Sequence, residues 1–145
     1  MRLSAKTEYA AIAVLELARQ WTADEPVRIR SICEAHGVPA RFLVQILLQL
    51  KGAGIVTSTR GAAGGYQLAK PPSDITLEDV LRVIEGPEEL MTAVTAELAG
   101  RSRTVNVMLD AWRQVARAET DALRGITFAE LVERSRAANE PMYYI

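Results

Sequence analysis

The chain has 145 residues, of which 49% are hydrophobic and 24% are charged, and its formal net charge is −1. This length and composition fit one globular domain with a substantial core. The sequence shows no apolar run long enough to span a bilayer and no secretory signal at its start, and its single cysteine, Cys33, excludes an intramolecular disulfide. We therefore expect a cytoplasmic protein with no membrane partner.

The charges divide unevenly along the chain. Residues 1–70 carry nine Lys and Arg against five Asp and Glu, a net charge of +4, whereas residues 71–145 carry eight against thirteen, a net charge of −5. Positive charge in the first half favours a polyanionic partner there. The alternative is a chance scatter of a few charges, so the asymmetry supports a function only together with a motif.

The first third of the chain has the pattern of helix, turn and helix. A first helix is predicted from about residue 7 to 20, then a polar turn that Pro26 closes, a short edge strand at 27–29, and a short helix at 30–36 that Gly37 ends. The next helix begins near Pro39 or Ala40, because the fixed φ of proline suits a first helical position. This spacing predicts a helix-turn-helix whose second helix reads DNA.

That recognition helix runs into a glycine-rich hairpin. Gly52 and Gly54 are expected to end the helix, since glycine tolerates the left-handed backbone of a C-terminal cap. Two short β-prone runs, 55–59 and 66–68, are then joined by the loop Arg60–Gly65. A helix followed by a ribbon that carries an arginine predicts a winged helix-turn-helix, which binds duplex DNA.

Two classes of DNA contact are predicted. Arg41, Val44 and Gln45 lie at the start of the recognition helix, where side chains reach base edges. Gln45 can pair with adenine, Arg41 can reach guanine or a phosphate, and Val44 offers only an apolar contact, for example to a thymine methyl. The alternative for Arg41 and Gln45 is an ordinary exposed helix residue. Phosphate contacts are expected from the N-terminus and the wing, namely from Arg2, Ser4, Lys6, Thr57, Ser58 and Thr59. Arg60 and Tyr66 of the wing are further candidates for DNA contact.

The residues after the wing are predicted to be helical. A break at 71–73 precedes helices at 77–85, about 102–124 and about 128–137, and capping-box-like pairs start the first and last of them, Thr76 with Asp79 and Thr127 with Glu130. We interpret residues 1–72 as the DNA-binding region and 73–145 as a helical dimerisation or effector region of one compact domain. The predicted fold class is mainly α with a small β-wing and a long dimerisation helix.

The longest predicted helix carries an apolar stripe that needs a surface to cover. That surface is either the rest of the same chain or a two-fold partner. We favour a partner, because a DNA-reading dimer needs one long element to set the spacing of its half-sites. The tail, residues 139–145, is too apolar for a solvated end and is expected to dock on the body or on the partner. The stripe comprises Val105, Met108, Leu109, Trp112, Val115, Ala116 and Leu123.

Several of these segments together resemble the Rrf2 family of bacterial transcription regulators: residues 1–4, the wing 60–66, residues 75–77 and residues 126–131. They occur in the family's order and spacing over nearly the whole chain. The resemblance implies a homodimer with a winged helix-turn-helix, and it implies a minor-groove role for Arg60, otherwise a solvated loop arginine. Such a role favours narrow, A·T-rich grooves. A known branch of the family has a glutamate where this chain has Val44, so that branch's operator preference is not implied.

Many members of the family hold an iron–sulfur cluster with three cysteines in the loop before the long helix. Residues 87–103 contain no cysteine here, and thiolates are what hold cluster iron, so the usual cluster is not expected. In a minority branch a glutamate of the first helix and a histidine closing the second are ligands, and Glu8 and His36 fall at those positions. Two ligands make half a site. We favour a surface role for Glu8 and a helix-dipole role for His36.

The predicted function is a sequence-specific DNA-binding transcriptional regulator that acts as a homodimer, with a protein or small molecule as a further effector. Two alternatives stay open, a metal- or cluster-dependent redox sensor that uses Glu8 and His36, and a regulator controlled by a partner protein. An enzyme is the least favoured class, because the sequence shows no catalytic set and the glycines 61–65 lack the lysine and helix of a phosphate cradle. Cys33, between Ile32 and Glu34, is interpreted as apolar filler rather than a redox thiol.

Overall fold

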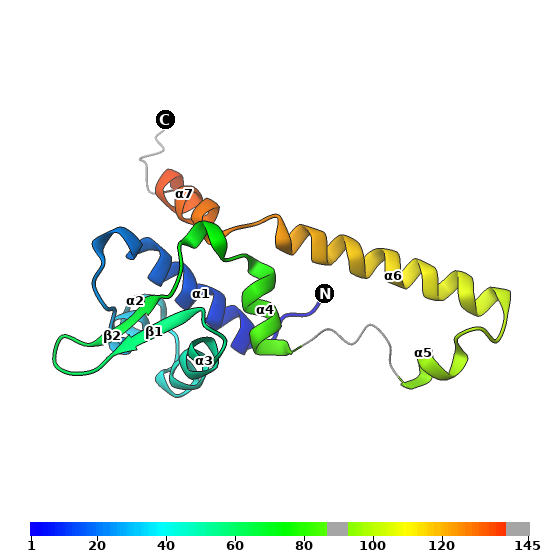
Figure 1. Ribbon diagram of the computed structural model, residues 1–145, viewed down its shortest axis with the longest axis horizontal. Helices are drawn as coiled ribbons and strands as arrows, with labels where there is room; N and C mark the ends of the chain where they lie inside the picture. Colours follow the sequence, from blue (N-terminus) through cyan, green and yellow to red (C-terminus); the bar gives the residue numbers. More distant parts are fainter. Residues whose placement is uncertain (87–92, 139–145) are drawn as a thin grey trace.

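The structure is a computed structural model, and it describes residues 1–86 and 93–138. These residues form seven helices, one two-stranded sheet and two single 3-10 turns (Figure 1). The predicted fold class, mainly α with a small β-wing, is confirmed. In chain order the elements are α1 (Ala5–Arg19), η1 (Trp21–Ala23), α2 (Ile29–His36), α3 (Ala40–Gly52), β1 (Val56–Thr59), β2 (Gly65–Leu68), η2 (Pro72–Asp74), α4 (Leu77–Glu85), α5 (Ala93–Leu98), α6 (Arg103–Arg124) and α7 (Phe128–Ala138).

Helix α1 is the centre of the core. Its buried side chains are mostly small, so α3, α4 and α7 can approach it closely, and each of them packs against it. Both halves of the chain supply this core, because Ile75, Val80 and Phe128 are buried together with residues of α1 and α3. The boundary near residue 72 is thus a proposed division of roles within one core. The buried residues of α1 are Thr7, Ala10, Ala13, Val14, Leu17 and Ala18.

Helices α2 and α3 form the predicted helix-turn-helix. Gly37 ends α2 in the left-handed conformation, with φ at 69°, and Pro39 precedes α3 with an extended backbone, so Ala40 is the first helical residue. Helix α3 ends at Gly52, and Gly54 rather than Gly52 takes a positive φ, 78°. One face of α3 is buried, through Leu43, Ile46, Leu47 and Leu50.

The wing is an antiparallel hairpin in which Val56 pairs with Leu68 and Thr59 with Gly65. The edge strand predicted at 27–29 is a single bridge, between Val27 and Tyr66. That bridge explains a glycine: a Cβ at Gly65 would lie 2.5 Å from the Val27 carbonyl oxygen, at a φ of 155°. At Gly64, a Cβ would lie 2.1 Å from the Thr59 carbonyl oxygen. The wing therefore requires both glycines and is attached to the body through Val27, which pairs with Tyr66 near the tip end of β2.

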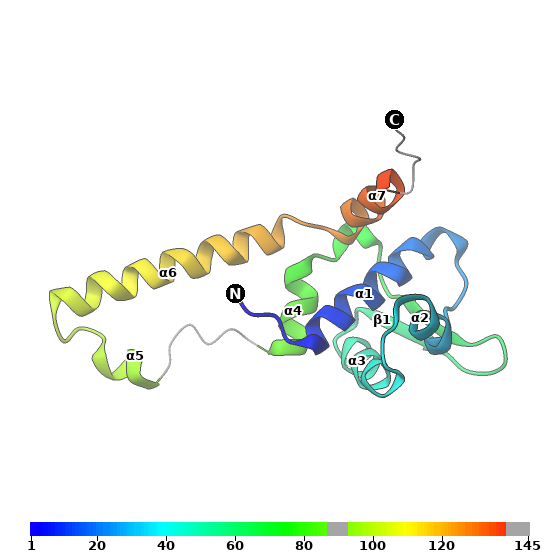
Figure 2. The ribbon, with the colours of Figure 1, turned by 180° about the vertical axis from the view of Figure 1, so that it is seen from behind.

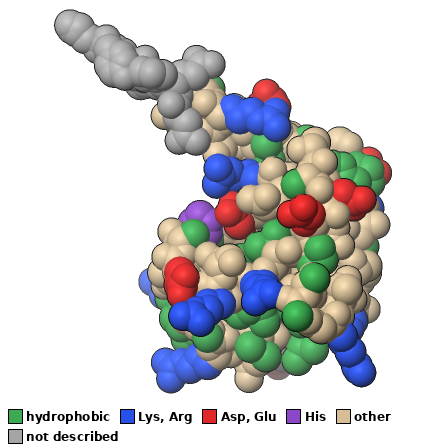
Figure 3. Space-filling model, turned by 90° about the vertical axis from the view of Figure 1, so that its left-hand side faces the viewer, with side chains coloured by type: hydrophobic (Ala, Val, Ile, Leu, Met, Phe, Trp, Pro, Cys, Tyr) green, Lys and Arg blue, Asp and Glu red, His purple; other side chains and the backbone are tan. Residues whose placement is uncertain are grey.

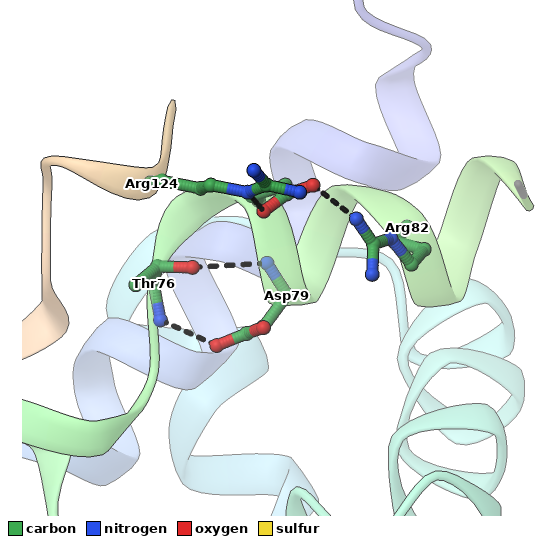
Figure 4. Close-up of polar contacts among 5 residues, drawn as sticks. Thr76, Asp79, Arg82 and Arg124 are labelled. Carbon is green, nitrogen blue, oxygen red and sulfur yellow. Dashed lines mark hydrogen bonds and ion pairs between the residues drawn. The ribbon is translucent and has the colours of Figure 1, made fainter. Parts of the chain in front are cut away.

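A cluster of polar contacts joins α4 to the end of α6 (Figure 4). The predicted capping box is present, since the Asp79 amide donates to Thr76 Oγ1 and the Thr76 amide donates to Asp79 Oδ2. Beside it, the Glu78 carboxylate accepts from Arg82 on one oxygen and from Arg124 Nε on the other, at 2.6 Å in the second case. A backbone bridge between Thr76 and Thr127 completes the cluster.

Helix α6 projects away from the body, and α5 lies at its far end (Figures 1 and 2). Helix α6 has 22 residues, which make it about 33 Å long. The Ser102 hydroxyl caps the start of α6 by accepting a hydrogen bond from the Val105 amide. Helix α5 was not predicted, and the predicted tail at 139–145 lies outside the described residues. Among the helices described, none is both long and apolar enough to cross a membrane.

Replacing Phe128 by alanine should lower the free energy of unfolding by about 3–5 kcal/mol, because the ring is completely buried where α7 meets the core. Urea denaturation followed by circular dichroism measures this change. Arg134→Ala, at an exposed site of the same helix, is the control and should shift it by less than about 0.5 kcal/mol. A change below about 1 kcal/mol in F128A, with a separate early transition, would show that α7 unfolds independently of the core.

Candidate nucleic-acid interface

The outward face of α3 is free of contacts with the other helices. Its neighbours in the fold, α1, α2, α4 and β1, lie on the side of the buried leucines and isoleucine. The guanidinium of Arg41 stacks over the Phe42 ring at 4.9 Å, and Phe42 lies 5.8 Å from the ring of Tyr9. Stacking holds Arg41 at the start of this face. The exposed residues of the face are Arg41, Val44, Gln45, Leu48 and Gln49.

Beside α3, the wing forms a shallow hollow of about 500 Å³ with three cationic side chains, Arg28, Lys51 and Arg60. Among the described residues that line the hollow, none is acidic. Lys51, in the last turn of α3, donates from Nζ to Ser58 Oγ at 2.6 Å. This contact ties the recognition helix to β1 and leaves a positive surface suited to a phosphate backbone.

Arg28 holds the tip of the wing, because its guanidinium donates a hydrogen bond to the Ala62 carbonyl oxygen. Neither Arg28 nor Lys51 was among the predicted site residues. Lys51 could have been predicted as a phosphate contact, because it is a basic residue in the last turn of the recognition helix. Arg28 had no such signal, since 34 residues separate it from its partner.

The predicted contact residues of the wing do not all lie in the hollow. Ser58 faces Lys51 and lines the hollow together with Thr59, whereas Thr57 is exposed and is not among its lining residues. Tyr66 lines the hollow and is half-buried against the Val27 bridge. Figure 3 looks onto the end of the molecule where the wing lies, and Lys and Arg side chains stand out along the lower part of this face among hydrophobic ones.

The N-terminal candidates lie beside α4. Ser4 caps α1 by accepting from the Thr7 amide, and the hydroxyls of Ser4 and Thr7 donate to Glu85 Oε1 at 2.5 and 2.6 Å. These two hydrogen bonds lower the pKa of Glu85 below its ordinary value, and the one from Ser4 has the larger effect. The positive charge of Lys6 lowers this pKa further. The Ser4 side chain is therefore held by protein groups rather than free for a phosphate.

The chain start continues toward α6. The Met1 amino group lies 3.3 Å from Glu119 Oε1, and Arg2 lines a groove of about 870 Å³ between α4 and α6. Arg2 thus lies with the long helix, and the structure does not bring it to the free face of α3. The groove is lined by both signs of charge, with Glu85 and Asp121 among its acidic residues.

Within the described residues, the apolar stripe of α6 is only partly covered. Met108, Trp112 and Val115 are 49%, 64% and 50% exposed, although they lie on one side of the helix. None of the residues of α6 is buried. The other predicted stripe residues, Val105, Leu109, Ala116 and Leu123, are half-buried.

The metal candidates do not come together. His36 Nε2 lies 3.5 Å from Glu16 Oε2, which also pairs with Arg19, whereas Glu8 is exposed two turns earlier on α1. Eight residues of helix, a rise of about 12 Å along α1, separate Glu8 from the Glu16 that His36 contacts. Within residues 1–86 and 93–138, no three His, Cys, Asp or Glu side chains are grouped for a metal. Cys33 is half-buried in α2.

Known proteins share this architecture. The family model for Rrf2, described as an iron-dependent transcriptional regulator, matches residues 3–134. Rv1287 of Mycobacterium tuberculosis, named an HTH-type transcriptional regulator, is 35% identical over 131 residues, which cover 90% of this chain and 81% of its own. The HTH-type transcriptional regulator CymR of Bacillus subtilis is 30% identical over 146 residues, with both chains fully covered. Among solved structures, IscR of T. potens superposes with a TM-score of 0.77 at 31% identity, over 99% of this chain and 95% of its own.

Replacing Glu85 by glutamine should lower stability slightly at pH 7, by less than about 1 kcal/mol at this exposed site. Because the pKa of Glu85 is lower in the folded state, its carboxylate stabilises the fold above the ordinary value of 4.5, and this contribution is lost as the pH falls toward the folded pKa. Urea denaturation at several pH values should show the difference in unfolding free energy between wild type and E85Q shrinking as the pH falls below 4.5. Glu97→Gln, on exposed α5, is the control. A difference that persists unchanged at pH 3 would contradict the hydrogen-bonded carboxylate.

Proposed function

The chain belongs to the Rrf2 family of DNA-binding transcriptional regulators, and we propose that it binds duplex DNA as a homodimer with α3 in the major groove. The observation that carries this proposal is the pairing of a free α3 face with a cationic hollow of the wing, joined by the contact between Lys51 and Ser58. A recognition helix that exposes polar side chains next to a positive surface can read bases and hold phosphates at once.

Base contacts come from the start of α3. Gln45 can present its amide to adenine, and Arg41 can reach guanine or a phosphate from its position over Phe42. Phosphate contacts come from the hollow, where Lys51 and Arg28 supply charge that the sequence interpretation had left out. Arg60 reaches the minor groove, and Lys6, Thr57, Ser58 and Tyr66 stay candidates for contacts that fix the register.

The homodimer forms through α6. A stripe with three large apolar side chains about half exposed or more needs a partner surface, and a second α6 offers the same stripe under two-fold symmetry. The length of α6, about 33 Å, is close to one turn of B-DNA, so paired long helices can place two recognition helices on successive major grooves.

The family description names iron, and the residues of this chain do not fit its usual cluster. One cysteine is present, in α2, and His36 pairs with Glu16. We propose that the protein regulates transcription in the cytoplasm without a resident cluster, through a protein or small-molecule effector, and that it has no enzymatic activity. Metal analysis and the visible spectrum of protein purified without oxygen test this proposal, and iron in a stoichiometric amount would contradict it.

Selection of bound sequences from a random duplex pool tests the function itself and supplies an operator. In gel-shift titrations with that operator, Arg60→Ala should weaken binding by about 1–3 kcal/mol, because the guanidinium reads a groove. Arg134→Ala, an exposed arginine of α7, is the control and should bind as wild type does. Equal affinities of R60A and wild type would remove Arg60 from the interface.

Trp112→Asp should dissociate the dimer and abolish tight DNA binding together, because it places a charge in the centre of the apolar stripe. Multi-angle light scattering measures the mass. Trp21→Asp, at an exposed tryptophan of η1, is the matched control and should stay dimeric. A W112D protein that runs as a dimer would reject α6 as the interface.

A further inference from the structure

The free face of α3 carries two exposed aliphatic side chains, Val44 and Leu48, that are not part of the hydrophobic core. Leu48 is 56% exposed and Val44 is 43% exposed, although both belong to a helix whose other apolar face is fully buried. They are four residues apart, so they lie on the same side of α3 in successive turns. Arg41 and Leu48 differ by about 20° around the helix, which places Leu48 at the centre of the face that Arg41 begins.

Single exposed leucines are common on protein surfaces, but this pair stands in a special setting. The side chains around it on α3 are Arg41, Gln45 and Gln49, and the nearby wing hollow carries Lys51 and Arg60. Val44 and Leu48 thus form an apolar patch within a cationic and polar surface. Such a surface suits a partner that is anionic overall and presents an apolar group to this patch. Duplex DNA is such a partner, because the C5-methyl group of thymine is the apolar feature that base pairs present in the major groove.

We propose that Val44 and Leu48 determine operator specificity by contacting thymine methyl groups, an inference that rests on the proposed binding of α3 in the major groove. One helical turn separates the two side chains, about 6 Å along α3. Base pairs follow each other every 3.4 Å or so, so the pair spans about two steps. The half-site therefore contains one thymine, or two thymines about two base pairs apart, close to the base that Gln45 reads.

Uracil tests this directly, because it differs from thymine in a duplex only by the missing methyl group. The operator recovered from the random pool is synthesised with single thymine-to-uracil replacements at every position of one half-site. For wild type, one or two replacements should weaken binding about three- to five-fold each, the value of one buried methyl group. A thymine-to-uracil replacement outside both half-sites should leave the dissociation constant unchanged.

The double variant V44A/L48A should bind thymine and uracil operators with affinities within about 1.5-fold of each other. Alanine favours helix and both sites are exposed, so the variant should fold, which circular dichroism checks. If the double variant binds too weakly to measure, the ratio of its affinities for the thymine and uracil operators is determined with the single variant L48A instead. Val94→Ala, a 63% exposed valine of α5 at the far end of α6, is the matched control and should keep the wild-type ratio.

Three results would overturn the inference, and they are distinguishable. Wild type that binds every uracil operator as tightly as the thymine operator shows that no methyl is read, while sequence-specific binding stands. A double variant that keeps the three- to five-fold ratio assigns the methyl contact to other residues. A wild-type protein that prefers no duplex in the pool fails the proposed function itself.

Discussion

The carboxylate of Glu78 links the end of α6 to the part of the protein that carries the DNA-reading face. No residue of α6 is buried, so the hydrophobic core does not fix the direction of this helix. Glu78 instead joins Arg82 of its own helix to Arg124 at the end of α6, beside the backbone bridge between Thr76 and Thr127 (Figure 4). One carboxylate shared by two guanidinium groups orients the side chains more firmly than an isolated surface pair. The spacing of two recognition helices in a dimer would thus be set at this junction.

A second polar junction lies at the opposite end of α4. There Glu85 accepts from both Ser4 and Thr7, so the last turn of α4 is bound to the first turn of α1. Helix α4 packs directly on both α6 and α3, and α1 packs on α3 and α4, so α4 is the direct physical connection between the long helix and the recognition helix.

Local signals in the sequence predicted most of the fold. Thr76 with Asp79 and Ser102 before α6 fix helix starts by hydrogen bonds within four residues, and the wing glycines are required by backbone geometry. Contacts between distant residues could not be predicted, because 81 residues separate Ser4 from Glu85 and 46 separate Glu78 from Arg124. Leu48 was missed for another reason. It stands between Leu47 and Leu50, and its apolar character at that spacing looks like core until the packing shows it is exposed. The roles assigned to the DNA-contacting and dimerisation residues stay predictions.

The attachment of the wing to the body affects how Arg60 meets its target. The Val27 bridge to Tyr66, near the tip end of β2, and the Arg28 contact to Ala62 in the tip loop restrict the hairpin before any partner arrives. A loose arm loses conformational freedom when it binds, which weakens the complex, whereas a braced arm loses little. A braced arm also cannot stretch to follow an unsuitable duplex. A groove that is too wide, or out of phase with α3, then lies beyond the reach of Arg60. In the proposed complex the protein would therefore select DNA by its shape even where no base is contacted.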